Sequence, residues 1–207
     1  MFYQLCRSFI VIILCVTLVL CDKYTNKFNG IYGCKQTNAV NNYNHPTEFI
    51  PTEHFENISA GWNSTFLRIG IFGKQDGIIR LSKKAMPYNK DTLHEIMIGM
   101  NSNKNTEVRR QVRNNINHHR NHVLAKIPTP NILSELEPFV LTIEFGLGGV
   151  VRLTRDGETV PFLEFSDPEV EICHNYIGFS NWASKMIYFF DCPVSNFAAR
   201  MEFEALR

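Results

Sequence analysis

The sequence predicts an all-β protein, an antiparallel β-sandwich of jelly-roll type with roughly ten short strands. From Phe66 onward, strand-length runs of β-branched and aromatic residues follow one another with turn signals between them. Several runs alternate apolar with polar residues, and none sustains the 3.6-residue stripe of a helix. Short strands without intervening helices are typical of sandwiches and barrels rather than of βαβ units.

The expected strands can be placed in order along the chain. In GVVRLTR, for example, Val151 and Leu153 point to one face and Arg152 and Thr154 to the other, as in a half-buried strand. In chain order the runs are FLRIGIF, GIIRLS, HEIMIGM, TEVRRQV, HVLAKI, FVLTIEF, GVVRLTR, PFLEFS, YIGFS and KMIYFF.

The glycine-rich stretch EFGLGGVVRL, residues 144–153, is expected to be a hairpin tip. A dinucleotide-binding loop needs G-x-G-x-x-G between a strand and a helix, but Val151 takes the third glycine position and a strand follows. We therefore expect Gly146, Gly148 and Gly149 to supply positive φ angles at a turn.

Residues 1–21 have the layout of a secretory signal peptide. Arg7 precedes 13 uncharged and mostly apolar residues, Phe9 to Cys21, whereas spanning a bilayer takes roughly 20. We expect cleavage after Cys21, with an uncleaved N-terminal anchor as the alternative. No second long apolar run follows, so the mature chain is predicted to be secreted, extracellular and without a membrane span.

The rest of the chain divides into three parts. Residues 22–60 are rich in Asn, Thr and Tyr and are expected to form a loosely structured N-terminal extension with a strand or two. Residues 61–192 form the predicted sandwich domain, and residues 193–207 a C-terminal tail with a short helix. The chain carries 21 Lys and Arg against 20 Asp and Glu, and this balance does not suggest a nucleic-acid partner.

Two further features agree with the secretory route. Asn57 and Asn63 each begin an N-glycosylation sequon. Beyond the signal peptide the cysteines are Cys34, Cys173 and Cys192. One disulfide among them is expected in an oxidising compartment, and the third thiol stays free or pairs with another chain. The sequence leaves open which two pair.

Four blocks occur in order along the middle of the chain: HEIMIGMNSNKNTEVRRQV, IPTPNILSELEPFVLTIEF, GETVPFLEFSDP and NYIGFSNWAS. Together they resemble the farnesoic acid O-methyltransferase-like domain of secreted and other invertebrate proteins, over roughly Phe66 to Cys192. That family has Y-E-I-x-I-G-G, S-V-I-R-R, T-P-G-I-L-S, P-F-L-S-W-T-D-P and Y-V-G-F-x-T-x-x-G-A-S. The matching positions are Glu95, Ile96, Ile98, Gly99, Arg109, Arg110, Thr129, Pro130, Ile132, Leu133, Ser134, Pro161, Phe162, Leu163, Asp167, Pro168, Gly178, Phe179, Ala183 and Ser184.

The chain departs from the family pattern at several points. Met100 replaces the second glycine of the first block, and Phe139 and Phe145 stand where tryptophans are expected. The family name implies methyl transfer from S-adenosylmethionine to farnesoic acid. Most such enzymes use a glycine loop after the first strand and an acidic residue that binds the ribose, and this sequence offers neither.

Three groups of polar residues are candidates for binding. The segment from 104 to 126 is basic and could bind sulfated glycans or acidic head groups, against the alternative of a solvated hairpin. Its candidate residues are Lys104, Arg109, Arg110, Arg113, Arg120 and Lys126. Weak metal candidates are His118, His119 and His122, more simply explained as a solvated loop. A calcium site is considered for Glu164, Asp167, Glu169 and Glu171. Glu169 and Glu171, two residues apart, fit the solvent-exposed face of a strand better.

The segment GFSNW, residues 178–182, is not expected to be a nucleophile elbow, because Trp182 replaces its last glycine. We expect Trp182 in the core, with a ligand patch shared with Tyr176 and Phe179 as the alternative. No catalytic residue is assigned. The sequence favours a non-catalytic recognition module that binds a partner protein, a glycan or a small apolar ligand and needs no cofactor. The alternative is O-methylation of farnesoic acid or a related isoprenoid acid with S-adenosylmethionine.

Overall fold

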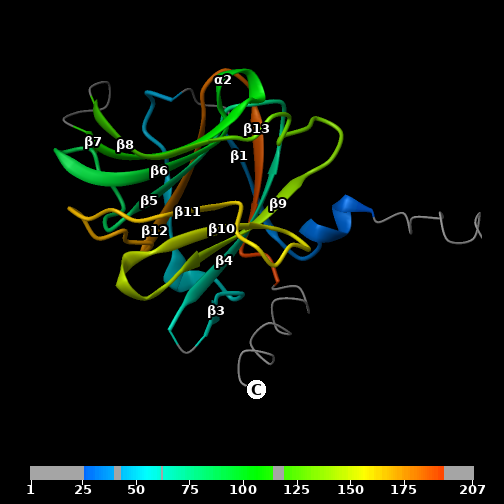
Figure 1. Cartoon of the computed structure of the whole chain (residues 1–207), viewed down its shortest axis with the longest axis horizontal. Coiled ribbons are helices and arrows are strands. Elements are labelled where there is room, and N and C mark those ends of the chain that lie inside the picture. The colour runs from blue at the N-terminus through cyan, green and yellow to red at the C-terminus, as the bar shows by residue number, and fades with distance from the viewer. Residues whose placement is uncertain (1–25, 40–42, 62, 114–118, 194–207) are drawn as a thin grey trace, which may run out of the picture.

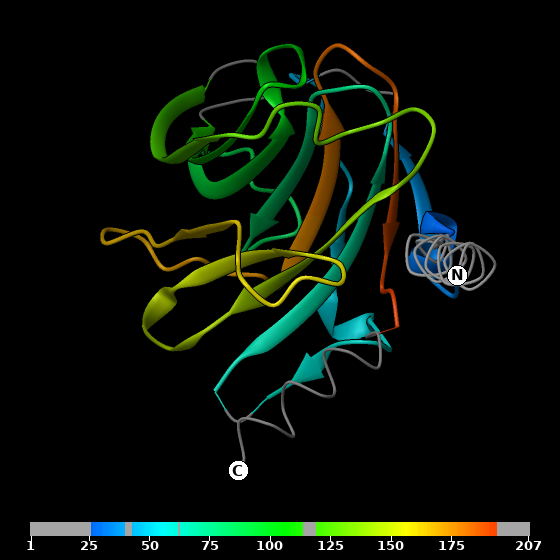
Figure 2. The same ribbon diagram turned by 45° about the vertical axis from the view of Figure 1, so that its right-hand side comes forward.

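The computed structural model describes residues 26–39, 43–61, 63–113 and 119–193. They form two antiparallel sheets packed face to face (Figures 1 and 2). Sheet A contains β1 (Lys35–Ala39), β3 (Ser59–Ala60), β4 (Thr65–Phe72), β9 (Phe139–Phe145), β10 (Val151–Arg155), β11 (Leu163–Phe165) and β13 (Met186–Phe190). Its order is β1-β13-β4-β9-β10-β11, with β3 beside β4.

Sheet B contains β2 (Phe49–Pro51), β5 (Gly77–Ser82), β6 (Asp91–Gly99), β7 (Asn105–Arg113), β8 (His119–Pro128) and β12 (Tyr176–Asn181). Its order is β2-β12-β5-β6-β7-β8. Short helical turns connect the strands: η1 (Lys27–Ile31), η2 (Thr52–His54), α2 (Met100–Asn103) and η3 (Leu147–Gly149). No helix in the described part of the chain is long and apolar enough to cross a membrane.

The core lies between the two sheets. Alternate residues of each strand point inward, so β4 contributes Ile69 and Ile71 while β6 contributes Ile96 and Ile98, all at most 1% exposed. Burying one such side chain stabilises the fold by about 1.5–3 kcal/mol. This period-two pattern confirms the predicted all-β antiparallel sandwich.

The predicted strands correspond to β4 through β13. Strands β1, β2 and β3 come in addition, from residues 35–60. This segment was expected to be a loosely structured extension with a strand or two, and β1 and β2 form edges of the two sheets. The helix expected in residues 193–207 lies outside the described residues, apart from Pro193, as does the signal peptide.

The glycine stretch turns the chain between β9 and β10, which pair as an antiparallel hairpin. Gly148 and Gly149 have φ angles of 73° and 76°, as expected at a turn. Gly146 differs, because its φ is −93°. It needs no left-handed backbone, since its N–H closes the hairpin by donating to the Val150 carbonyl at 2.8 Å.

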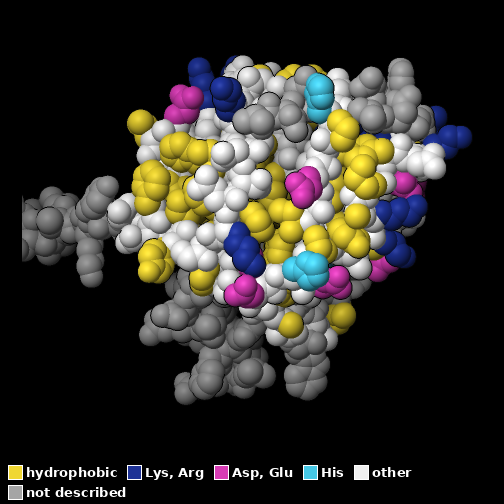
Figure 3. All heavy atoms as spheres, turned by 180° about the vertical axis from the view of Figure 1, so that it is seen from behind, with side chains coloured by type: hydrophobic (Ala, Val, Ile, Leu, Met, Phe, Trp, Pro, Cys, Tyr) yellow, Lys and Arg dark blue, Asp and Glu magenta, His cyan; other side chains and the backbone are white. Residues whose placement is uncertain are grey.

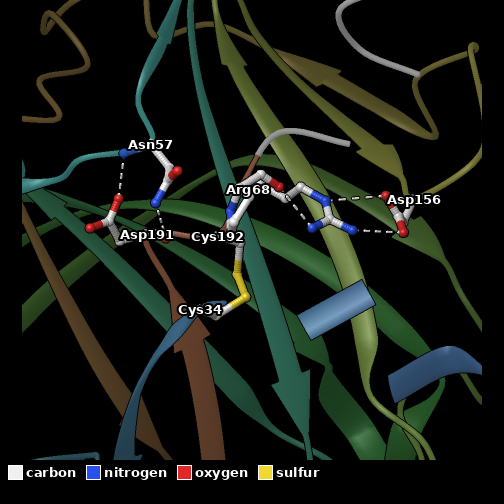
Figure 4. The surroundings of a disulfide bond; sticks show 7 residues. Cys34, Asn57, Arg68, Asp156, Asp191 and Cys192 are labelled. Atoms are coloured by element: carbon white, nitrogen blue, oxygen red, sulfur yellow. Dashed lines mark hydrogen bonds and ion pairs between the residues drawn. A yellow bond between two sulfur atoms is a disulfide. The ribbon is translucent and has the colours of Figure 1, made fainter. Parts of the chain in front are cut away.

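A disulfide joins Cys34 to Cys192 across 158 residues. Figure 4 shows it between the start of β1 and the end of β13, next to Asp191. The Asp191 carboxylate accepts hydrogen bonds from the backbone N–H groups of Glu56 and Asn57. It also pairs with Lys35 at 2.8 Å. Residues far apart in the chain are thus tied together at one end of the sandwich.

Candidate functional site

A cavity of about 250 Å³ with polar and apolar lining residues lies where β5 and β6 meet the segment between β11 and β12. Two strand ends of sheet B and a connection from sheet A therefore form its walls. We refer to it as the His94 cavity. Its lining residues are Leu81, Ser82, Lys83, Lys84, Asp91, Thr92, His94, Val170, Glu171 and Cys173.

His94 is the buried polar group of this cavity. It lies on the same face of β6 as the core residues Ile96 and Ile98, and its side chain is only 3% exposed. Its Nε2 lies 2.9 Å from Oδ2 of Asp167, whose side chain is completely buried. The carboxylate therefore fixes the orientation of the imidazole ring.

Asp167 is itself held by several donors. Arg110, which is opposite His94 on β7, donates to its Oδ1 at 2.8 Å. The backbone N–H of Glu169 donates to the same oxygen at 3.0 Å. Arg110 also reaches the Glu169 carboxylate at 2.6 Å. The segment after β11 is thus fastened to the inner face of sheet B by one buried carboxylate.

The protonation states in this cluster follow from its surroundings. Burial would raise the pKa of Asp167, but the hydrogen bond from His94, the Glu169 N–H and the charge of Arg110 hold that pKa below its ordinary value. Burial lowers the pKa of His94 despite its contact with Asp167, and Arg110 lowers it further. An ionised Asp167 only accepts hydrogen bonds. His94 is therefore neutral near pH 7 with its proton on Nε2, which leaves Nδ1 as an acceptor for a ligand.

The remaining lining residues carry both signs of charge. Lys84 pairs with Asp91 across the mouth of the β5–β6 connection, while Lys83 and Glu171 are exposed. Cys173 is not part of a disulfide. Burial and the nearby Glu171 raise the pKa of its thiol, so it is protonated near pH 7 and a poor nucleophile. The cavity therefore offers hydrogen-bond donors and acceptors rather than an activated nucleophile.

The six candidate cations of the basic hairpin are dispersed in the structure. Arg110 pairs with Asp167 as described, and Glu107 pairs with both Arg109 and Lys126. Lys104 and Arg120 are exposed. Charged side chains of both signs are interspersed with hydrophobic ones on the face shown in Figure 3.

Arg113 occupies an unexpected place, because it is completely buried on the outer face of sheet B. There it lies beside Gln111, Glu95 and Arg80, beneath Tyr43. Tyr43 donates to Glu95 at 2.7 Å, and its carbonyl accepts from Arg80 at 2.8 Å. The segment before β2 thus covers a buried polar network, which we call the Tyr43 network.

The other candidates are placed as follows. His118 lies outside the described residues, His119 begins β8, and His122 is exposed. No group of three or more His, Cys, Asp or Glu that could hold a metal ion occurs in the described ranges. Glu164 pairs with Arg152 at 2.7 Å, and Asp167 and Glu169 with Arg110. Cys34 and Cys192 form the disulfide, which the sequence left open.

Trp182 is not a core residue, because 52% of its surface is exposed. It follows β12 and its ring packs on Tyr43, with ring centroids 4.5 Å apart. Phe179, considered as its partner, is instead buried in the core. Of the sequon residues, Asn63 is exposed at the β3–β4 turn, whereas Asn57 is half-buried and donates to the Asp191 carbonyl at 2.8 Å.

Sequence reasoning missed His94 as a functional residue. One signal was available, because HEIMIGM has histidine where the resembling family motif begins with tyrosine. Arg110 and Asp167, in contrast, occupy positions that match the motif. The structure shows that these two matching residues contact each other and that the departing residue joins them.

Fold and cavity together define a disulfide-linked β-sandwich domain with a cavity that contains a buried histidine. Residues 43–194 match the farnesoic acid O-methyl transferase family, and the chain belongs to this family. The match begins at Tyr43, so it includes the segment that covers the Tyr43 network. A search among curated proteins found no match.

Several solved structures align with this chain at low similarity. The galectin LEC-6 of Caenorhabditis elegans aligns with a TM-score of 0.43 and 10% identity, over 70% of this chain and 89% of that one. The sialidase CBM40 of Ruminococcus gnavus, bound to α2,3-sialyllactose, aligns with a TM-score of 0.35 and 10% identity, over 80% of this chain and 97% of that one. The receptor binding domain of a botulinum neurotoxin C/D mosaic serotype aligns with a TM-score of 0.35 and 14% identity, over 70% of this chain and 36% of that one.

The family description implies S-adenosylmethionine as methyl donor. The described residues do not fit a nucleotide-type site for it. The glycine stretch leads into β10 rather than a helix, and added Cβ atoms at Gly148 and Gly149 would meet only open space. These glycines therefore turn the chain between two strands and lack the helix that a dinucleotide-binding loop requires.

Proposed function

We propose that this chain is a secreted recognition domain that binds a neutral carbohydrate in the His94 cavity without changing it chemically. One observation carries the proposal: a buried, neutral histidine is fixed by a buried carboxylate in a cavity lined by polar groups. Such preorganised groups let a ligand bind without ordering the protein first.

The chemistry of the lining supports a sugar. Hydroxyl groups both donate and accept hydrogen bonds, and the cavity offers the acceptors His94 and Glu171 beside the donors Lys83 and Thr92. An isoprenoid chain would leave the buried imidazole of His94 without a partner for Nδ1, which costs roughly 1–3 kcal/mol. The lining therefore favours a polyhydroxylated ligand over an apolar one.

The size of the cavity supports a small ligand. Pockets for drug-sized molecules usually enclose about 300–1,000 Å³, and the His94 cavity encloses about 250 Å³. That volume suits one sugar residue better than a methyl donor and an isoprenoid acid together. Secretion is supported by the signal-like segment and by the Cys34–Cys192 disulfide, because disulfides persist in oxidising compartments.

The competing function is S-adenosylmethionine-dependent O-methylation of farnesoic acid or a related isoprenoid acid, which the family match favours. It requires a site for the methyl donor, and the described residues do not fit the usual one. Carbohydrate binding needs no methyl donor, whereas O-methylation does. Binding and methyl-transfer assays on the same protein samples can therefore distinguish the two functions.

The test uses full-length protein purified from the culture medium. We expect binding to immobilised neutral mono- and oligosaccharides, weakened at least tenfold by His94→Gln, and no methyl transfer from labelled S-adenosylmethionine to farnesoic acid. Asn89→Ala, an exposed change outside the cavity, is the matched control. Ester formation above a heat-inactivated sample would overturn the proposal, and so would saccharide binding that His94→Gln leaves unchanged.

A further inference from the structure

The segment from Cys173 to Tyr176 separates two cavities. Cys173 lines the His94 cavity, and the next residue, His174, lines a second cavity of about 380 Å³. Consecutive Cα atoms are about 3.8 Å apart, so a single stretch of backbone stands between the two. The second cavity, which we call the His174 cavity, is lined by Thr52, Glu53, Ile58, Thr65, His174, Asn175 and Tyr176.

The dividing backbone is held firmly. The backbone N–H of Thr52 donates to the Asn175 carbonyl at 2.9 Å, and the Thr52 hydroxyl donates to the His174 carbonyl at 2.7 Å. Thr52 is only 5% exposed. Tyr176 then enters sheet B between Pro51 and Ser82. The wall between the cavities is therefore preorganised rather than an adjustable loop.

His174 resembles His94 in its protonation state but differs in its surroundings. Its ring stacks on Phe145, with centroids 4.2 Å apart and planes inclined by 20°. Burial lowers its pKa, so it is neutral near pH 7. Within the described residues, nothing hydrogen-bonds to its ring nitrogens. One donor and one acceptor therefore remain for a ligand.

The two cavities complement each other chemically. The His94 cavity contains no Phe, Tyr or Trp among its lining residues, whereas the lining of the His174 cavity includes Tyr176 and Ile58 beside Glu53 and Asn175. A pyranose ring has apolar C–H faces and a polar hydroxyl edge. It can place a face on an aromatic ring while its edge bonds to polar side chains.

We propose that the two cavities are adjoining subsites for one neutral oligosaccharide, with successive sugar residues on either side of the Cys173–Tyr176 segment. This inference rests on the proposed function and extends it, because it specifies a ligand of at least two sugar residues. The lining disfavours an anionic ligand, because Lys83 and Lys84 stand against three carboxylates, those of Glu53, Asp91 and Glu171, and both histidines are uncharged.

The experiment compares ligand length in matched variants. Binding of glucose, cellobiose and cellotriose, and of the corresponding galactose and N-acetylglucosamine series, is measured by titration calorimetry on the full-length protein. The variants are Thr92→Ala in the His94 cavity, Asn175→Ala in the His174 cavity and Asn89→Ala outside both. Urea unfolding of each variant verifies that it is folded.

We expect the disaccharide of at least one series to bind more tightly than its monosaccharide. Thr92→Ala should weaken both by about five- to tenfold, as the loss of one hydrogen bond implies. Asn175→Ala should weaken only the disaccharide and longer ligands, by a similar factor.

Two results would overturn the inference in different ways. If Thr92→Ala weakens binding while Asn175→Ala has no effect at any length, the His174 cavity is not a subsite and the proposed function stands. If the unaltered protein binds no saccharide at millimolar concentration, the proposed function fails and the inference fails with it.

Discussion

Asp167 and His94 are 73 residues apart in the sequence and 2.9 Å apart in the fold. Asp167 follows β11 of sheet A and His94 belongs to β6 of sheet B, so their contact links the two sheets beside the core. The same contact orients the imidazole of the proposed binding site. Stability and ligand binding should therefore both depend on it.

Replacing Asp167 with asparagine should destabilise the fold by about 3 kcal/mol, because it removes one charge of a buried pair and leaves Arg110 without its carboxylate partner there. Urea unfolding followed by tryptophan fluorescence measures this change. Glu169→Gln is the control, since Glu169 also contacts Arg110 but is 66% exposed, and its loss should cost at most about 1 kcal/mol. Equal effects of the two changes would contradict a special role for the buried carboxylate.

Stability should decrease as the pH is lowered below about 6.5, the ordinary pKa of histidine. Burial lowers the pKa of both His94 and His174, so the unfolded chain takes up protons in this window while the folded chain does not. The slope of the unfolding free energy with pH is therefore positive there, and it vanishes below the folded pKa values. Urea unfolding between pH 5 and 8 checks the sign.

His94→Gln should remove part of that slope. Asp167, Arg110, Asp91, Glu171, Lys83 and Lys84 are the charged groups around this histidine. Asp167 acts in a different window, because its lowered pKa stabilises the fold above about pH 4 and this contribution is lost only in more acidic solution. A slope that the His94→Gln variant retains in full would contradict the assignment to His94.

Loss of the disulfide should destabilise the fold strongly. Cys34→Ser or Cys192→Ser should cost roughly 2–5 kcal/mol, because the unfolded chain loses the constraint of a long closed loop. Cys173→Ser should change stability by less than about 1 kcal/mol, since Cys173 forms no disulfide and is partly exposed. Thermal unfolding with and without reductant compares the three variants. Reductant should destabilise only the Cys173→Ser protein, because it alone keeps the disulfide, and a Cys173→Ser protein that reductant leaves unchanged would refute this pairing.

Two arginines of the basic hairpin should respond very differently to mutation. Arg113→Ala should destabilise the fold by about 3–5 kcal/mol, because it empties a buried position beside Glu95 and Gln111. Arg120→Ala should change stability by no more than about 0.5 kcal/mol, since Arg120 is exposed. The midpoint of urea unfolding distinguishes the two variants. If Arg113→Ala left the midpoint unchanged, the Tyr43 network would not contribute to the stability of the fold.

The strand pattern from Phe66 to Phe190 was predictable because the core selects alternate residues along each strand. The position of strand β1 within residues 22–60 could not be predicted, because it is an edge strand of the sequence KQTNA, in which only Ala39 is buried. Its place is fixed by pairing with β13 rather than by its own composition. Edge strands with few apolar residues carry little of the periodic signal.

The candidate site was only partly predictable, because its contacts join residues distant in the sequence. Arg113 lies on the outer face of β7, where a solvent-exposed side chain is expected. Its burial depends on Tyr43, which is 70 residues earlier in the chain. Polar residues on the outer face of a sheet are normally exposed to solvent. Here the segment that contains Tyr43 covers them, so they are buried. The placing of His94 beside Asp167 likewise depends on how the segment after β11 crosses sheet B.

The Cys34–Cys192 bond converts almost the whole sandwich into a covalent ring. A protease that cuts once at any exposed connection within this ring would leave a single molecule of nearly unchanged mass. The two pieces would separate only after reduction. A recognition domain built in this way can tolerate a nick in one loop without losing the strands that form its cavities.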